Sequence, residues 1–292
     1  MEDSVMDFKD VELWLALYDQ KNITKTAQRL YLSQPALTNR IKKVEDEFGT
    51  DLLIREHSGI EFTPNGRKFI QHCQILKNDY QALQADLLST SDEIHGSLTI
   101  GVTSIFARFR LPDLLKKYLE LNPQVNISVK TGRSWDVYPL LKNQETPVAI
   151  LREGYAWNDG KQLLADEPLC LANLSKISFD ELQQSDYIEY NTDPYLKGQI
   201  EHWYNERFSA LPPVRMTASN IDTALAFVSA GLGWAILPKI VLKNFKGYVK
   251  PLRWQNGKDF TRSTWLCYYE NSLRSPAVAS FVSFIKENAV LL

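Results

Sequence analysis

The sequence has few cysteines and no long apolar run. A membrane-spanning helix needs roughly 20 consecutive apolar residues, so we expect no membrane partner. Cys73, Cys170 and Cys267 are odd in number and far apart, which favours free, buried thiols in a reducing cytoplasm over disulfides. A redox-sensing cysteine pair is the alternative. The acidic start MEDSVMDFKD lacks the apolar core of a secretion signal. The chain is therefore expected to be cytoplasmic.

Residue patterns for catalysis and cofactor binding are also missing. The four histidines, at positions 57, 72, 95 and 202, have no spacing typical of a zinc site. The sequence contains no Gly-x-Ser-x-Gly elbow, Walker loop or dinucleotide fingerprint. We therefore expect no metal, no cofactor and no enzymatic activity.

The composition is that of an ordinary globular protein with more than one domain. A chain of 292 residues is long for one hydrophobic core. Hydrophobic residues make up 44% and charged residues 23% of it, which is normal for globular proteins. The formal net charge is only -2, so the global balance does not suggest a nucleic-acid partner.

A local cluster of basic residues does suggest one. Between Lys21 and Lys43 the sequence contains six basic residues and no acid. Such a cluster places a positive field on one face, which contact with DNA phosphates requires. Its members are Lys21, Lys25, Arg29, Arg40, Lys42 and Lys43.

The same region, residues 23–42, is typical of a helix-turn-helix. Ser33 is suited to cap a second helix, and Pro35 fits the first turn of that helix. Leu37, Ile41 and Val44 recur at helical spacing on one face. An ordinary pair of surface helices is the alternative. We expect the opposite face and its surroundings to contact double-stranded DNA through Thr24, Gln34, Pro35, Thr38, Asn39, Arg40, Lys43 and Arg55.

Short apolar segments after this region predict a small hairpin. Residues 52–55 and 60–63 flank the polar turn His57-Ser58-Gly59. A hairpin after a helix-turn-helix is a wing, from which Arg55 could reach the minor groove or the DNA backbone. With an opening amphipathic helix at residues 7–18, capped by Asp7, this gives a domain over residues 1–63.

Residues 64–91 predict a long helix with a narrow apolar stripe. Its apolar positions alternate in steps of four and three, as in a heptad repeat. A helix packed on its own effector domain is the alternative to a dimerising linker. The expected dimer seam is Phe69, Cys73, Leu76, Tyr80, Leu83 and Leu87.

The remainder, residues 92–292, has the alternating strands and helices of an α/β fold. Strands are expected at residues 97–102, 125–129 and 148–151, with a helix at 111–121. We expect a first lobe over residues 92–168 and 264–292, and a second over residues 169–263. Two crossings between two α/β lobes describe a cleft for a small ligand.

Three motifs together resemble the LysR-type bacterial transcriptional regulators. They are SQPALTNRIKKVEDEFGTDLLIRE, the following FTPNG, and VSAGLGWAILP at residues 228–238. The resemblance extends over most of the chain. It implies a winged helix-turn-helix, a dimerising linker helix and a two-lobed α/β effector domain similar to periplasmic binding proteins. It also implies a homo-oligomer, either a dimer or a dimer of dimers. Asn39 and Arg40 depart from residues common in the family, which affects base preference.

The effector half is similar to citrate-sensing members of this family, at residues 148–154, 190–194 and 262–266. Arg152 follows a buried strand and Arg262 precedes another. Ligands of open α/β sheets collect at the carboxyl ends of strands, and arginine suits a carboxylate. A surface ion pair, for example of Arg152 with Glu153 or Asp166, is the alternative. The expected effector-binding residues are Thr103, Ser104, Arg152, Tyr190, Asn191, Thr192 and Arg262.

We therefore interpret the chain as a sequence-specific transcriptional regulator whose effector is a small carboxylate such as citrate. A solute-binding or transport module with an appended helical domain is the alternative. That alternative does not explain the cluster of basic residues between Lys21 and Lys43.

Overall fold

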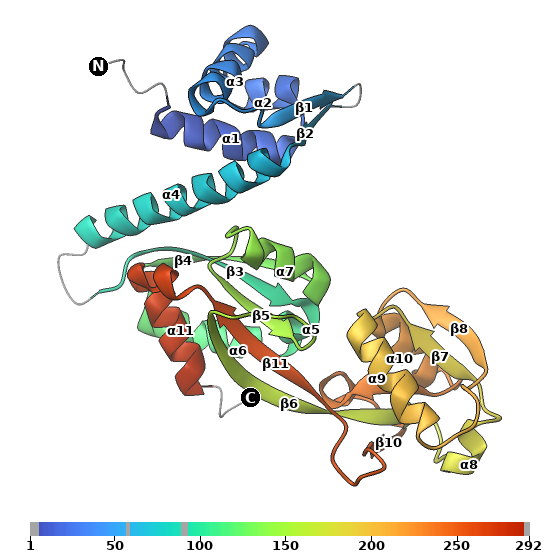
Figure 1. Cartoon of the computed structure of the whole chain (residues 1–292). Helices are drawn as coiled ribbons and strands as arrows, with labels where there is room; N and C mark the ends of the chain where they lie inside the picture. The colour runs from blue at the N-terminus through green and yellow to red at the C-terminus, as the bar shows by residue number, and fades with distance from the viewer. Residues whose placement is uncertain (1–5, 57–58, 89–92, 289–292) are drawn as a thin grey trace.

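The computed structural model describes residues 6–56, 59–88 and 93–288, which form a winged domain, a long helix and a two-lobed domain (Figure 1). The side chains of Asp7 and Ser33 cap the first and third helices, as expected from the sequence. The two strands pair antiparallel as a wing, whose tip at residues 57–58 lies outside the described residues. The elements of the winged domain are α1 (Phe8–Gln20), α2 (Ile23–Arg29), α3 (Gln34–Phe48), β1 (Leu53–Glu56) and β2 (Gly59–Phe62).

The core of the winged domain forms around Trp14, which is fully buried. Leu37, Ile41 and Val44 of α3 pack into this core, which confirms the face of the helix that the spacing predicted. Burying the apolar face of α3 leaves its polar face outward.

The long helix α4 (Pro64–Leu88) uses its apolar stripe in two ways. Phe69 and Cys73 pack against the core of the winged domain, and Cys73 is only 1% exposed. Cys73 therefore holds α4 to its own domain, so its assignment to a dimer seam was wrong. Farther along, Leu76, Leu83 and Leu87 are exposed. The expected polar break at residues 89–92 lies outside the described residues.

The first lobe is a covered sheet with helices on both faces. β5 has β3 and β11 as its neighbours, and its residues alternate between two cores, one with α6 and α11 and one with α7. Burial on both faces explains why the sequence of β5 is continuously apolar. The elements of this lobe are β3 (Gly96–Thr103), α5 (Ser104–Phe109), α6 (Leu111–Leu121), β4 (Val125–Gly132), α7 (Ser134–Lys142), β5 (Val148–Arg152), η2 (Glu270–Arg274) and α11 (Pro276–Asn288).

Two long antiparallel strands, β6 (Gly160–Asn173) and β11 (Thr261–Tyr268), run between the lobes (Figure 1). Residues 160–168 of β6 pair with β11, and residues 169–173 pair with strands of the second lobe. The lobes therefore share one sheet and meet near Pro168. The second lobe contains α8 (Phe179–Leu182), β7 (Tyr187–Tyr190), α9 (Pro194–Asn205), β8 (Val214–Ala218), α10 (Ile221–Ser229), β9 (Ala235–Pro238), η1 (Lys239–Leu242) and β10 (Tyr248–Pro251).

Candidate effector pocket and DNA interface

A cavity of about 220 Å³ lies between the two lobes. All seven residues that the sequence predicted for effector binding line it. Those from the first lobe lie at the carboxyl ends of β3 and β5, residues 190–192 lie at the end of β7 and directly after it, and Arg262 lies near the start of β11. The structure thus brings together residues that are up to 159 positions apart, from Thr103 to Arg262.

Four helices begin at this cavity. Thr103, Arg133, Asp193 and Asn220, which precede α5, α7, α9 and α10, all line it. The amide groups of the first turn of a helix lack intrahelical partners and carry a partial positive charge. Several helix starts around one cavity favour an anionic ligand.

Arg152 lies in the floor of the cavity and is 5% exposed. Its Nη2 donates to Glu167 Oε2 at 2.9 Å and its Nη1 donates to Thr264 Oγ1 at 2.9 Å. Burial and the nearby charge of Arg262 lower the pKa of Arg152, while the carboxylate of Glu167 opposes this shift. The partner of Arg152 is therefore Glu167, and not Glu153 or Asp166.

Arg262 is equally buried and forms an ion pair with Asp193, the N-cap residue of α9. The expected lobe bounds placed Arg152 and Arg262 on opposite sides of the cleft. That was wrong, because Arg152 pairs in register with Thr264 and Arg262 lies two residues earlier on the same strand. Side chains two residues apart on a strand share a face. Both arginine side chains therefore project from the same face of the sheet that the two lobes share.

Four polar atoms of the cavity are buried without a hydrogen-bond partner: Thr103 Oγ1, Tyr190 OH, Arg152 Nε and Arg262 Nε. Burial raises the pKa of Tyr190 to about 12, so its hydroxyl stays protonated at neutral pH. Buried polar groups nearly always have a partner. A ligand with several oxygen atoms would satisfy these groups.

Sequence reasoning missed several residues of the cavity. Asp193 and Asn220 each precede a helix, and a capping signature could have placed them. Arg133, Ser134 and Trp135 open α7, where Pro139 inside the helix obscured the pattern. Glu167 does not line the cavity itself, and it had no local signal, because its role depends on pairing with Arg152, 15 positions away.

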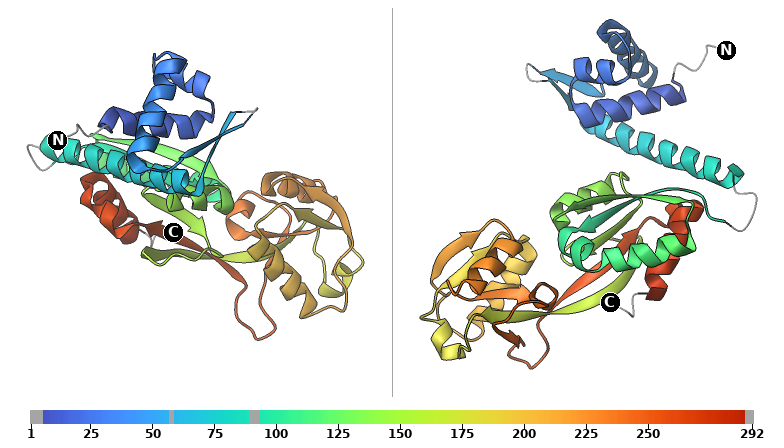
Figure 2. Two further views of the ribbon diagram at one scale, coloured as in Figure 1. Left: turned by 45° about the horizontal axis from the view of Figure 1, so that its top comes forward. Right: turned by 180° about the vertical axis from the view of Figure 1, so that it is seen from behind.

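The helix-turn-helix lies at the end of the molecule away from the effector domain (Figures 1 and 2). Gln34 is exposed at the start of α3, and the Thr24 hydroxyl donates to its side-chain oxygen at 3.3 Å. Asn39 and Lys43 are also exposed on α3, and Thr38 is half-buried. The polar face that the sequence predicted is thus accessible to a partner.

Arg40 has a different position from the one we expected. Its Nε lies 2.8 Å from Asp10 Oδ1 and its Nη2 lies 3.2 Å from Asp7 Oδ1. The hydrogen bond to buried Asp10 raises the pKa of Arg40. Arg40 therefore joins α3 to the start of α1, and we do not include it among the phosphate contacts proposed below.

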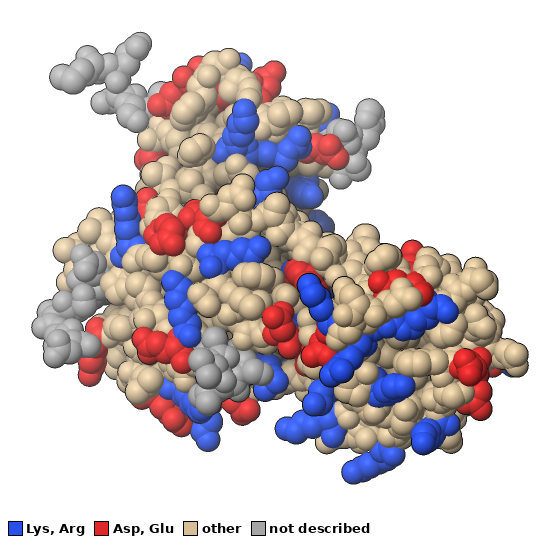
Figure 3. All heavy atoms as spheres, turned by 60° about the horizontal axis from the view of Figure 1, so that its bottom comes forward, with Lys and Arg blue, Asp and Glu red and all other residues tan. Residues whose placement is uncertain are grey.

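Basic side chains remain available around the recognition helix. Lys25, Lys43 and Arg55 are exposed, and Arg55 extends from the wing strand β1. On the face of the effector domain shown in Figure 3, by contrast, Lys and Arg are interspersed with Asp and Glu. That face of the effector domain does not present the uniform positive field that DNA requires.

Two absences hold within the part of the chain that the structure describes. No group of three or more His, Cys, Asp or Glu side chains could hold a metal ion. No helix there is long and apolar enough to cross a membrane.

Two family models match the chain. Residues 8–67 match the bacterial regulatory helix-turn-helix protein model of the lysR family, and residues 91–290 match the LysR substrate binding domain model. The uncharacterized HTH-type transcriptional regulator YraN of Bacillus subtilis is 35% identical over 282 residues, which is 96% of this chain and 98% of that regulator. The transcriptional activator IlvY of Haemophilus influenzae is 27% identical, over 81% of this chain and 85% of IlvY.

Solved structures show the same fold. Full-length OxyR from Pseudomonas aeruginosa matches with a TM-score of 0.71 at 18% identity, over 96% of this chain and 95% of that one. Full-length CbnR in complex with its target DNA matches with a TM-score of 0.62 at 18% identity, over 97% and 99%. The similar proteins are regulators of transcription and not enzymes. The chain belongs to the LysR family of bacterial transcriptional regulators.

Proposed function

We propose that this regulator binds promoter DNA as a homo-oligomer in the cytoplasm and that a small carboxylate, best represented by citrate, controls it. The observation that carries the proposal is the cavity between the lobes. All seven expected residues line it together with four unpartnered, buried polar atoms.

The charge of the cavity favours a carboxylate with more than one acidic group. Four arginines and two aspartates line it. Two of these arginines, Arg152 and Arg262, are buried, and arginine binds carboxylates through two parallel hydrogen bonds. Thr103 and Tyr190 add unpartnered hydroxyl groups on either side. This donor set suits an anion with several oxygen atoms.

Similarity in sequence suggests citrate within this class. The segments 148–154, 190–194 and 262–266 resemble the citrate-sensing catabolite control protein E. Each segment contributes at least one residue to the cavity: Arg152 from the first, residues 190–193 from the second, and Arg262 from the third.

On the DNA, two groups of residues have separate roles in our proposal. Gln34, Pro35, Thr38 and Asn39 read base edges from the start of α3. Lys43 and Arg55 hold phosphates, and Thr24 orients Gln34 through the hydrogen bond between them. Two copies joined through α4 would present two such helices to a pseudo-palindromic site. Ligand-driven closure of the lobes would then bias how the two winged domains are spaced.

Calorimetry with citrate and related di- and tricarboxylates tests the proposal. We expect Arg152→Ala and Arg262→Ala each to cost about 2–5 kcal/mol of binding free energy, roughly 30-fold or more in affinity. Arg215→Ala is the matched control, because Arg215 is an exposed arginine whose ion pair with Asp186 lies outside the cavity. Equal citrate affinity in wild type and both cavity variants would remove these arginines from the site.

A further inference from the structure

Tyr31 lies in the turn between α2 and α3, directly before the recognition helix. Its side chain is 97% exposed, and its backbone has a φ of 56°, in the left-handed region. A bulky residue at positive φ is an outlier that costs folding free energy. The left-handed backbone closes the turn after α2, because the Tyr31 amide donates to the Gln28 carbonyl at 3.2 Å and the Leu32 amide donates to the Ala27 carbonyl at 2.9 Å. Glycine or asparagine would close this turn at less cost, and the exposed tyrosine ring gains no packing within the chain, which leaves it free for a contact outside the chain.

The position of Tyr31 identifies the partner. It stands two residues before Ser33, the N-cap of the recognition helix, and three before Gln34. A tyrosine has an apolar ring and a polar tip, which suits the sugar and the phosphate of a DNA strand. We propose that the Tyr31 hydroxyl donates a hydrogen bond to a DNA phosphate beside the groove that α3 enters.

A phosphate contact by a neutral group has a distinctive signature. Lys43, as a cation, would release a counterion on binding, so its loss lowers the dependence of affinity on salt concentration. Tyr31 carries no charge to release. Tyr31→Phe should therefore lower affinity about tenfold on operator and random DNA alike, with the salt slope unchanged.

Fluorescence anisotropy across a salt series on the full-length protein tests this proposal. Lys43→Ala is the comparison variant, with a reduced slope. Tyr31→Asn separates binding from stability, because asparagine adopts the left-handed region more readily. It should equal or exceed wild type in thermal stability while losing as much affinity as Tyr31→Phe. Wild-type affinity in Tyr31→Phe, or a changed salt slope, would overturn the proposal.

A second inference concerns α7, which reaches from the effector cavity to the winged domain. At the start of α7, Arg133, Ser134 and Trp135 line the cavity, and Arg133 Nη2 donates to the Ser219 carbonyl of the second lobe at 3.4 Å. The Ser134 hydroxyl also accepts from the Arg152 amide at 3.3 Å. The start of the helix is thus bonded to both the ligand-binding strand and the opposite lobe.

The other end of α7 contacts the DNA-binding part of the chain. Within the described residues, three hydrogen bonds join α1 or α4 to Asn143 and Gln144, which directly follow α7. Asn143 Nδ2 donates to Tyr18 OH at 3.4 Å and its Oδ1 accepts from Gln71 Nε2 at 3.4 Å. The Gln144 carbonyl accepts from Asn78 Nδ2 at 3.3 Å.

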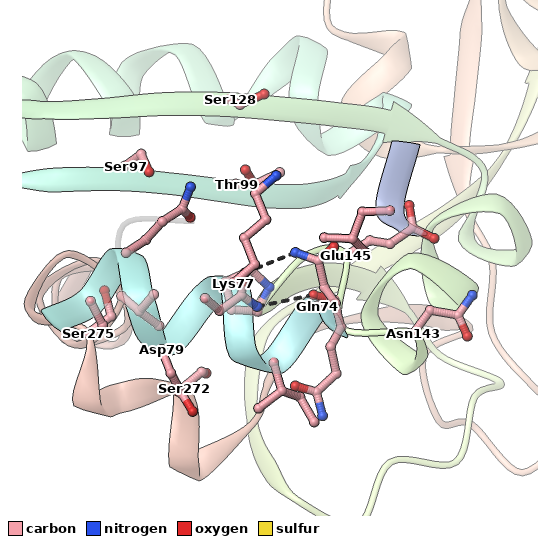
Figure 4. Close-up of a pocket in the computed structure, with 18 of the residues that line it drawn as sticks. Gln74, Lys77, Asp79, Ser97, Thr99, Ser128, Asn143, Glu145, Ser272 and Ser275 are labelled. Carbon is pink, nitrogen blue, oxygen red and sulfur yellow. Dashed lines mark hydrogen bonds between the residues drawn. The ribbon is translucent and has the colours of Figure 1, made fainter. Parts of the chain in front are cut away.

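Polar side chains dominate the space around this contact. A cavity of about 280 Å³ separates α4 from the edge of the first-lobe sheet. Figure 4 shows Gln74 and Lys77 of α4 on one side and Asn143 and Glu145 on the other. A polar contact of this kind, with little apolar packing, can shift between two arrangements at low cost.

We infer that α7 transmits lobe closure to the winged domain of the same chain. The buried side chains Val137 and Leu141 fix α7 to the sheet, and its nine residues extend over ~14 Å. Movement of the second lobe acts on Arg133, and the far end displaces Tyr18 and Asn78. The event that starts the movement, ligand binding, rests on the proposed function. The route of the movement through α7 rests only on the hydrogen bonds at its two ends.

A double-mutant cycle in the absence of any ligand tests the path. Arg133→Ala releases the lobe end of α7, and Asn143→Ala releases the winged-domain end. If α7 connects them, their effects on operator affinity are not multiplicative, and the coupling should exceed threefold. Asn126→Ala, an exposed asparagine on β4, replaces Asn143→Ala in the control cycle. Multiplicative effects within twofold would overturn the inference, whether or not citrate is the effector.

Citrate then tests the trigger separately. In Asn143→Ala, the citrate affinity measured by calorimetry should stay within twofold of wild type. The change in operator affinity that citrate produces should fall at least fivefold. Failure of citrate to bind the wild-type protein would contradict the proposed function. The ligand-free mutant cycle would still test whether α7 couples Arg133 to Asn143. A full citrate response in Asn143→Ala would overturn the role of α7.

Discussion

The side chains of Arg152 and Arg262 project from the same face of the neighbouring antiparallel strands β5 and β11, and each forms an ion pair with a different carboxylate. Glu167 binds Arg152 and Asp193 binds Arg262. Glu167 also accepts the Ile240 amide of the second lobe at 2.9 Å through its other oxygen. Each carboxylate therefore connects an arginine of the cavity to the second lobe. An incoming carboxylate must share or replace these internal partners.

Glu167→Gln should strengthen citrate binding. The neutral amide no longer competes for Arg152, while its oxygen still accepts the Ile240 amide. We expect a gain of about threefold to tenfold, or roughly 1 kcal/mol, by calorimetry. Asp259→Asn removes the carboxylate from an exposed ion pair with Arg253 and should leave affinity unchanged. Weaker binding in Glu167→Gln would show that the carboxylate orients Arg152 and does not compete with the ligand.

DNA binding should separate into specificity and general affinity. Replacing Gln34 by Ala removes a base-edge contact, so operator binding should fall by about 1–3 kcal/mol while random DNA is little affected. Replacing Lys43 by Ala should weaken both and lower the salt slope by about one unit. Anisotropy with an operator selected in vitro measures both effects. Unchanged discrimination in Gln34→Ala would mean that another face of α3 reads the bases.

The sequence predicted the cavity better than it predicted the electrostatics inside it. The alternation of apolar strands located β3 and β5, and the rule that ligands collect at strand ends led to Thr103 and Arg152. The carboxylates could not be found in this way. Asp193 meets Arg262 69 positions away, and no local pattern encodes a contact between distant segments.

The bounds of helices and strands also were predicted where the local sequence determines them and not where distant contacts do. α6 begins and ends at the residues that were expected from the sequence, 111 and 121. The 14-residue strand β6 was not predicted, because part of it lies open to solvent and part is buried in the second lobe. Its sequence therefore follows neither an alternating nor a continuous apolar pattern.

The exposed half of the α4 stripe should be the dimer interface. Leu76, Leu83 and Leu87 are 51%, 54% and 73% exposed, and a stripe of this kind is typical of a surface that a second helix covers. Leu76→Glu should dissociate the oligomer, because it places like charges in the seam of both chains. Light scattering measures the mass, and Gln84→Glu adds the same charge at an exposed polar position as a control. Wild-type mass in Leu76→Glu would refute the interface.

The stability of α1 should depend on pH through Asp7. Desolvation favours the protonated form, but the hydrogen bond from the Asp10 amide and the charge of Arg40 outweigh it and lower the pKa of Asp7 below its ordinary value of 3.8. A carboxyl group whose pKa is lower in the folded state stabilises the fold above its unfolded pKa. That stabilisation is lost as pH falls through the folded pKa. The contribution of Asp7 should therefore be complete at neutral pH and disappear below a pH of about 3.8.

Asp7→Asn isolates this effect, since asparagine also caps helices but does not titrate. At pH 7 the amides of α1 should exchange hydrogen faster in the variant than in wild type, because the ion pair with Arg40 is lost. The difference should close as the pH falls through the lowered pKa of folded Asp7, which lies below 3.8. Hydrogen exchange followed by mass spectrometry resolves residues 8–20 separately from the effector domain. A difference that persists at low pH would mean that Asp7 stabilises α1 through packing and not through its charge.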